Sequence, residues 1–418
     1  MIDGLDGAIE ARADRAVAFL ERLVAAPSTV GHERPAQQLV TEELERLGFT
    51  VSEITVPDDI GEDPTAGVPQ TDYRGRTDVL GTMGPPEGRS LLVNGHVDVV
   101  PPAEPDLWSD DPFDPIRVDG WLLGRGAGDM KAGFAMAFLA VEAVRDVAPD
   151  AIAGPLSFLS VIEEECTGNG TLAAARQGVL ADAVVLPEPT DLDLLVAGVG
   201  ILWLEIDVLG APGHAHVADR SVNPIEAAGR VIEGLRGLER QMNEHVVEAA
   251  FARVAHPYNV NIGTFAAGDW PSSVPARTRL GVRVGHPTSW TAVEAERHVR
   301  DAINRVAEGD GWLAANPPTV RTTGFRAQGY AIDPGHPLVR ALARAHRDAH
   351  GTDPTPVAMG STTDARYYLN GFGVPAVCYG PRTRNIHGVD EAVELRSIVD
   401  GAKTLARFIV DWYGGGRQ

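Results

Sequence analysis

The stretch RSLLVNGHVDVVP, residues 89–101, is an apolar run that ends in polar residues. An apolar run of this length predicts a strand that is buried on both faces. His96 and Asp98 lie at its carboxyl end. Because positions i and i+2 of a strand point to the same face, Asp98 can bind the second imidazole nitrogen of His96 and fix its tautomer. Taken alone, the pair is equally well explained by a histidine that is held by a loop carbonyl.

Strands and helices alternate on the carboxyl side of this stretch. Residues 121–147 predict a strand, a glycine turn and a helix, whereas 154–165 and 183–190 predict two more buried strands that end in acidic residues. This alternation predicts an α/β fold with a mostly parallel central sheet covered by helices on both faces. Ligands of such sheets bind beyond the carboxyl ends of the strands. The polar ends of these strands therefore indicate a functional site.

The order of elements changes after residue 198. A strand, a helix, two strands, a helix and a last strand follow one another, and this βαββαβ order is that of the ferredoxin-like split unit. We therefore expect an inserted α+β domain at residues 199–325, within a catalytic domain formed by residues 1–198 and 326–418. The length of 418 residues agrees with two domains of ordinary size.

The composition disfavours several classes of protein. The formal net charge is −22, and so acidic a surface repels nucleic acid and anionic membranes. The sequence contains no apolar run long enough to span a membrane, its first residues do not resemble a signal peptide, and its two cysteines form no C-x-x-C motif. We therefore expect a cytoplasmic protein with neither a membrane nor a nucleic acid as partner.

Five residues near the predicted strand ends have the chemistry of a two-metal hydrolase, which needs a bridging carboxylate, outer ligands and a general base. Asp129 begins a helix within GRGAGDMKAG, where it would repel a phosphate but can bind a cation. Of Glu164 and Glu165, one can contact the attacking water while the other binds a metal ion. Glu188 stands between two prolines, and His387 lies in a late loop. Each position also has a structural explanation, such as an N-cap aspartate or a solvated acidic turn.

In this order, the motifs HVD, GRGAGDMKAG, EEE, PEP and IHG resemble those of the zinc-dependent deacylases and exopeptidases that include acetylornithine deacetylase, succinyl-diaminopimelate desuccinylase, aminoacylase and glutamate carboxypeptidase. The resemblance extends over about residues 8–410. It implies a zinc-exopeptidase-like catalytic domain with an inserted lid, and two Zn²⁺ per chain for which Co²⁺ can substitute. The implied metal ligands are His96 and Glu188 for one ion, Glu165 and His387 for the other, and Asp129 as the bridge.

The resemblance also assigns roles around the metal ligands. Glu164 would be the general base, and Asp98 would be the partner of His96. The peptide bond between Asp129 and Met130 would be cis.

In the inserted domain, the segment LGAPGHAHVADRSVNPIEAA resembles a lid in which His214 and Asn223 are family positions. In dimeric relatives this histidine reaches into the partner's site and helps to hold the oxyanion. The resemblance therefore implies a homodimer formed through the lid.

Five further positions resemble the substrate contacts of this family. Asn261 and Arg283 lie on predicted strands, where the arginine would bind a substrate carboxylate; ordinary residues of a sheet surface are the alternative. GSTTDARYY resembles a substrate loop with Thr363, Asp364 and Arg366 as contacts.

The resemblance implies hydrolysis of the amide bond of a small N-acyl amino acid or related amine, of the acetylornithine or succinyl-diaminopimelate type. A dipeptidase or carboxypeptidase and a deformylase of an N-formyl aminopyrimidine are the alternatives within the family. A carboxylated substrate would depend on Arg283, whereas a neutral amine would not. A metal-free binding protein on the same fold is a third hypothesis, and the intact ligand positions and Glu164 argue against it.

Overall fold

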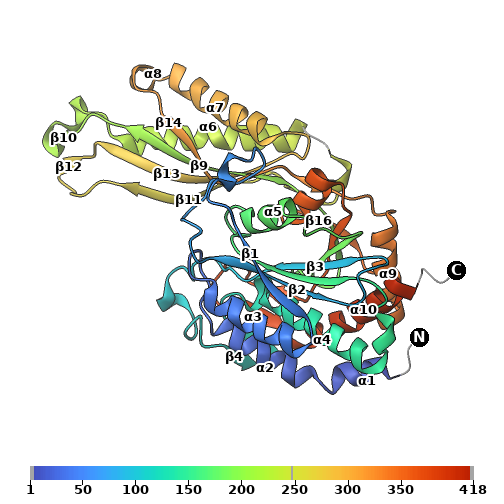
Figure 1. Ribbon diagram of the computed structural model, residues 1–418. Helices are drawn as coiled ribbons and strands as arrows, with labels where there is room; N and C mark the ends of the chain where they lie inside the picture. Colours follow the sequence, from blue (N-terminus) through green and yellow to red (C-terminus); the bar gives the residue numbers. More distant parts are fainter. Residues whose placement is uncertain (1–3, 246–247, 415–418) are drawn as a thin grey trace.

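The structure of the protein is a computed structural model that describes residues 4–245 and 248–414. Figure 1 shows a large body built around a wide sheet and an elongated body that projects from it. In the part of the chain that is described, no helix combines the length and the apolar character that crossing a membrane requires.

The central sheet has nine strands in the order β1-β2-β6-β3-β7-β17-β8-β15, and β16 pairs with β8. The inner strands β6, β3, β7 and β17 are parallel, whereas β1, β2 and β15 pair antiparallel. The predicted parallel sheet is therefore found at the centre, within a mixed sheet. The strands are β1 (Thr50–Thr55), β2 (Thr77–Met83), β3 (Leu91–His96), β6 (Leu156–Val161), β7 (Val184–Leu186), β8 (Leu194–Gly198), β15 (Tyr330–Ala331), β16 (Pro356–Met359) and β17 (Ala376–Cys378).

Helices cover both faces of this sheet. One group of helices lies below it in Figure 1 and shares with α9 the largest apolar core, in which α4 is buried almost all round. They are α1 (Leu5–Glu10), α2 (Ala13–Val24), α3 (Arg34–Arg46), α4 (Ala132–Val147) and α10 (Leu395–Gly414). On the other face, α5 (Asn169–Arg176) lies between the sheet and the projecting body. Helix α9 (Pro337–His350) packs beside α10.

The projecting body, here called the lid, contains a four-stranded antiparallel sheet in the order β11-β13-β9-β14. Helices α6 (Pro224–His245) and α7 (Ala292–Glu308) cover one face and share an apolar core with the strands. The chain order β9-α6-β11-β13-α7-β14 is the βαββαβ order predicted for this region. The strands are β9 (Gly200–Leu209), β11 (Val260–Ala267), β13 (Arg277–His286) and β14 (Thr319–Ala327).

A small sheet in the order β18-β19-β5-β4 joins two segments that lie far apart in the sequence. Its strands are β4 (Ile116–Val118), β5 (Trp121–Leu123), β18 (Thr383–Arg384) and β19 (Ala392–Glu394). The glycine turn with Asp129 follows β5, and the loop with His387 connects β18 to β19. This pairing therefore brings two of the predicted metal ligands to the same place.

Candidate functional site

The polar residues of the parallel strands meet at the carboxyl edge of the central sheet. His96 is the last residue of β3, the acidic turn Glu163–Glu165 follows β6, and Glu188 follows β7. These three neighbouring strands end side by side because they are parallel. The fold therefore places their functional groups at one edge, as the sequence indicates.

Asp129 belongs to two groups of metal-ligand type. Donor atoms of His96, Asp129 and Glu188 all lie within 4.8 Å of one another, and so do donor atoms of Asp129, Glu165 and His387. The first oxygen of Asp129 lies 3.2 Å from His96 Nε2, and its second oxygen lies 3.5 Å from His387 Nε2. A carboxylate that faces two histidines with its two oxygens has the geometry of a bridging ligand.

The electrostatics of these groups favour cations. Burial raises the pKa of Glu188 to about 8, and it raises the pKa of Glu164 well above its usual range. The negative charge of Glu165 is the main cause that raises the pKa of His387 to about 11. A bound cation would offset the cost of ionising Glu188, and carboxylates together with imidazole nitrogens form a donor set that divalent ions such as Zn²⁺ accept.

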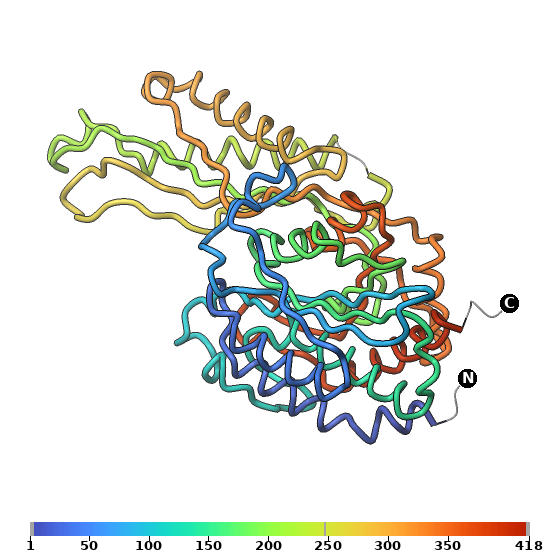
Figure 2. The backbone as a smooth tube through the Cα atoms, viewed as in Figure 1, coloured from blue at the N-terminus to red at the C-terminus, as the bar shows by residue number. Residues whose placement is uncertain are grey.

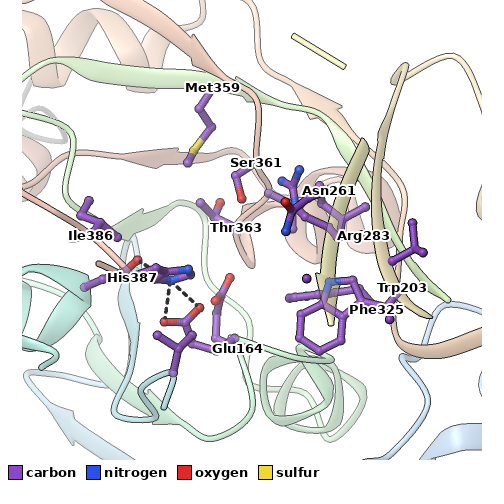
Figure 3. Close-up of a pocket in the computed structure, with 18 of the residues that line it drawn as sticks. Glu164, Trp203, Asn261, Arg283, Phe325, Met359, Ser361, Thr363, Ile386 and His387 are labelled. Carbon is purple, nitrogen blue, oxygen red and sulfur yellow. Dashed lines mark hydrogen bonds and ion pairs between the residues drawn. The ribbon is translucent and has the colours of Figure 1, made fainter. Parts of the chain in front are cut away.

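Glu164 lies beside the two groups and lines the adjoining cavity. Its Oε2 is 3.9 Å from His96 Nε2, and its side chain is largely buried. Figure 3 shows the Glu164 carboxylate pointing into the cavity near His387. This position suits a group that accepts a proton from a water molecule between the two ligand groups.

Asp98 contacts His96 Nδ1 through its backbone oxygen and, at a longer distance, through its carboxylate. The backbone oxygen of Asp98 lies 2.9 Å from His96 Nδ1, whereas its carboxylate is 3.7 Å away. The carboxylate also accepts the backbone N–H groups of Glu164 and Glu165, each at 3.1 Å. The Asp98 carboxylate thus forms an ion pair with the second imidazole nitrogen of His96 at 3.7 Å, while its backbone oxygen lies closer, because β3 ends at His96 and the i, i+2 rule of strands no longer sets the direction of the Asp98 side chain.

A buried network of hydrogen bonds holds Glu163, the first residue of the acidic turn. Glu163 accepts hydrogen bonds from Arg76 and Tyr73, each at 2.7 Å, and from Thr167 at 2.8 Å. Its backbone has a φ of 61°, a left-handed conformation that is uncommon for glutamate. The network therefore neutralises one carboxylate of the turn and leaves Glu164 and Glu165 for the site.

A cavity of about 690 Å³ lies between this edge of the sheet and the lid. Among the residues that the sequence analysis identified as substrate contacts, Asn261, Arg283 and Thr363 line it. Arg283 donates a hydrogen bond to the Gly360 carbonyl at 2.8 Å, and burial lowers the pKa of its guanidinium. An anionic substrate group would therefore offer Arg283 a compensating charge.

Comparison with known proteins gives the family. Residues 92–411 match the family model described as peptidase family M20/M25/M40. The protein belongs to the M20 family. Its relatives include an N-formyl-4-amino-5-aminomethyl-2-methylpyrimidine deformylase from Bacillus subtilis, 30% identical over 362 residues, which cover 81% of this chain and 84% of the relative. A succinyl-diaminopimelate desuccinylase from Methylobacterium sp. (strain 4-46) is 30% identical over 410 residues, which cover 95% and 96% of the two chains.

Solved structures agree with the M20 fold. The dipeptidase Dug1p from Saccharomyces cerevisiae superposes with a TM-score of 0.79 at 16% identity, covering 100% of this chain and 99% of the other. Human carnosine dipeptidase 1 gives a TM-score of 0.77 at 16% identity, with coverage of 99% and 100%. As a member of the M20 family with deacylases among its relatives, the protein is a metal-dependent hydrolase of amide bonds.

In this M20 chain, the peptide bond between Asp129 and Met130 is cis, as predicted. Two side chains, which the sequence analysis did not identify, hold the segment around it. Glu391 accepts hydrogen bonds from the backbone N–H groups of Gly128 and Asp129, at 2.8 and 2.9 Å. Arg125 forms an ion pair with Glu391 and donates to the Gly388 carbonyl at 3.1 Å. The only signal in the sequence was that both residues stand within or beside motifs already identified, GRGAGD and NIHGVDE.

Two of the predicted substrate contacts, Asp364 and Arg366, are not among the described residues that line the cavity between the sheet edge and the lid. Asp364 accepts a hydrogen bond from Thr171 at 2.6 Å, and Arg366 donates to the carbonyls of Thr363 and Thr167, at 3.0 and 3.1 Å. Both side chains are buried. The structure therefore uses them to hold the loop that carries Thr363.

His214 and Asn223 lie on the lid, and neither is among the described lining residues of the cavity. His214 is exposed in β10 (Gly213–His214), which in Figure 1 lies at the end of the lid far from the central sheet. Asn223 accepts the backbone N–H of Ile225 at 3.0 Å at the start of α6. Within one chain, the structure gives Asn223 a capping contact and leaves His214 away from the site.

Proposed function

We propose that this M20 hydrolase removes the acyl group from a small N-acyl amino acid or a related amine, and that it does so with two Zn²⁺ per chain, for which Co²⁺ can substitute. The observation that supports this best is the position of Asp129 between two ligand groups, with one oxygen facing each histidine. The proposed ligands are His96 and Glu188 on one side, Glu165 and His387 on the other, and Asp129 between them.

Metal ions at these groups would polarise the scissile carbonyl and make the attacking water more acidic. Glu164 would take the proton of this water and pass it to the leaving nitrogen, since its carboxylate points into the cavity beside His96. Asp98 would keep Glu164 and Glu165 in place through their backbone N–H groups. Arg283 would hold a carboxylate of the substrate, with Asn261 and Thr363 as neighbouring polar contacts.

We further propose that residues 1–198 and 326–418 form the catalytic domain, and that residues 199–325 form a lid through which two chains pair. Strand β11 is an edge strand of the lid sheet in the described residues, and most of its side chains are exposed. An exposed edge strand can pair with a second chain. His214 of one chain would then reach the site of the other, which its exposed position on the lid permits.

A cytoplasmic location belongs to the same proposal. Cys166 and Cys378 are both free and buried, which fits a reducing compartment.

A second candidate function is the removal of a formyl group from an aminopyrimidine-like amine. The B. subtilis relative with this activity is 30% identical over 81% of the chain, which favours this candidate. The two candidates differ in their need for Arg283. A carboxylated amino acid would lose most of its binding in an Arg283→Met variant, whereas a neutral amine would lose little.

The test combines metal analysis with a substrate panel. The purified protein is analysed for metal by mass spectrometry, and release of free amine is followed with N-acetyl, N-succinyl and N-formyl compounds. We expect about two zinc ions per chain, turnover of one acyl class, and loss of turnover but not of metal in Glu164→Gln. A protein that binds no metal, and that gains no activity when Zn²⁺ or Co²⁺ is added, would contradict the proposal.

A further inference from the structure

Four side chains form a row across the cavity-facing surface of the lid sheet. Asn261 on β11 stands opposite Arg283 on β13, and Arg283 stands opposite Trp203 on β9. Phe325 follows on β14, within an irregularity of the register that lies opposite Trp203. Residues directly opposite each other on neighbouring strands point to the same face, and all four line the cavity. The row therefore changes from polar at one end to aromatic at the other.

The aromatic end of the row is rigidly built. Trp203 and Phe325 contact each other edge to face, with ring centroids 5.2 Å apart and ring planes at 86°. The buried guanidinium of Arg366 lies over Phe325, with Cζ 5.3 Å from the ring centroid. Gly324 lets the indole lie against β14, because a Cβ at this position would come within 2.5 Å of Trp203 Cε3. Trp203 itself is half-buried, so it keeps free surface toward the cavity.

The charges of the cavity disfavour a substrate with a second ammonium group. Apart from the proposed ligands and Glu164, Arg283 is the only charged side chain among the described residues that line it. No carboxylate is therefore left to pair with a second ammonium group of a substrate. An ammonium that enters such a site without a partner loses its hydration without compensation. The remaining wall is largely apolar and includes Ile201, Val282 and Met359.

We propose that Trp203 and Phe325 form an aromatic subsite that selects substrates whose amine half carries a planar aromatic group, and that discriminates against amines with a second ammonium. The inference rests on the proposed amide hydrolysis, in which Arg283 holds a carboxylate of the amine half. The side chain next to that carboxylate would then reach Trp203, the neighbour of Arg283 in the row. In Figure 3, Trp203 and Phe325 lie across the cavity from His387.

The test uses three substrates that share the acetyl group and the α-carboxylate: N-acetyl-L-phenylalanine, N-acetyl-L-norleucine and N-acetyl-L-ornithine. We expect kcat/KM to fall in this order, by about 100-fold from the first to the last. Trp203→Ala would lower kcat/KM for the phenylalanine compound roughly 10- to 100-fold, and change that for the ornithine compound by less than about threefold. Trp203→Phe would restore most of the preference. Trp290→Ala is the matched control, since Trp290 stacks on His298 of α7 and is not among the described residues lining the cavity.

Equilibrium binding separates this inference from the proposed function. The three compounds are titrated into Glu164→Gln by calorimetry, with and without Trp203→Ala, and circular dichroism checks the fold of each variant. If Trp203→Ala fails to fold, Trp203→Leu takes its place. Tighter binding of the aromatic compound that is lost with Trp203 supports the subsite, even if no amide is hydrolysed. Hydrolysis or binding that favours ornithine, or a loss that is equal for all three compounds, overturns it and leaves the amide hydrolysis standing.

Discussion

Replacing Arg125 by methionine should destabilise the protein and weaken its metal binding together. Arg125 and Glu391 are each only 1% exposed, and they form an ion pair in the interior. Glu391 also holds the backbone on both sides of the Gly128–Asp129 bond, and Arg125 holds the carbonyl of Gly388, next to His387. The pair thus connects the segment of the proposed bridging ligand with the loop of another ligand.

The expected loss of stability follows from the charge of Glu391, which stays buried after Arg125 is removed. Breaking a buried ion pair by removing one partner costs about 3–5 kcal/mol, because the other charge stays buried without compensation. Burial already raises the pKa of Glu391, and Arg125 opposes this shift. Without Arg125 the carboxyl group can take up a proton, and two backbone N–H groups remain bonded to it. We therefore expect the lower end of the range, about 3 kcal/mol of the free energy of unfolding.

Urea unfolding of the metal-free protein, followed by circular dichroism, measures this loss. Arg117→Met is the matched control, because Arg117 pairs with Glu21 at 2.6 Å while its side chain is 45% exposed, and such pairs contribute about 1 kcal/mol or less. The double variant Arg125→Met with Glu391→Leu should recover part of the stability. The double variant should bind zinc roughly 10- to 100-fold more weakly than the wild type, because the replacement of Glu391 removes the acceptor of the Gly128 and Asp129 N–H groups. Equal stability of Arg125→Met and Arg117→Met would mean that the buried pair contributes no more to stability than the exposed one.

Four further predictions concern the site. Asp129→Asn should bind less than half of the wild-type zinc, as measured by mass spectrometry, because both ligand groups lose a shared anion. Dialysis against a chelator should abolish turnover, and added Zn²⁺ should restore it; activity that survives dialysis with no residual metal would contradict a metal-dependent reaction. Arg283→Met should raise KM for a carboxylated substrate roughly 10- to 100-fold with kcat little changed, and an unchanged KM would point to a neutral amine. Tyr73→Phe should cost about 1–3 kcal/mol in urea unfolding, since it removes a hydrogen bond from the buried Glu163 carboxylate, and no loss would mean that water replaces the hydroxyl.

The sequence predicted those parts of the fold that depend on local pattern. Apolar runs that end in polar residues identified β3, β6 and β7, and the change of element order identified the strands and helices of the lid. The antiparallel edge formed by β1 and β2 was not predicted, because the direction of pairing depends on which strands meet and leaves no period in the sequence. The small sheet formed by β18, β19, β5 and β4 was missed for the same reason, although it joins two segments that carry predicted metal ligands.

The sequence predicts a site residue well where the residue lies at the end of a strand. It predicts less where the role of a side chain depends on its contacts with distant parts of the chain. His96 and Glu188 are placed by their strands alone. Asp364 resembles a substrate contact in sequence, but its carboxylate accepts the Thr171 hydroxyl inside the fold. Glu391 gave no signal of its own, because the backbone groups that it binds are more than 260 residues away in the chain.

The segment between β1 and β2 connects β14 of the lid with the acidic turn Glu163–Glu165. Figure 2 shows this segment, in blue, rising from the central sheet to the base of the lid. The backbone N–H of Val68 donates to the carbonyl of Gly324 at 2.7 Å, directly beside Phe325, and Tyr73 donates to Glu163, directly beside Glu164. Asn169 ties the same segment to α5, since its amide donates to Tyr73 at 2.8 Å. Residues 68–73 therefore link the strand that carries Phe325 with the turn that carries Glu164 on this side of the cavity. If the lid closes over a substrate, this link would let the cavity narrow mainly from the opposite end of the row, where Asn261 and Arg283 stand.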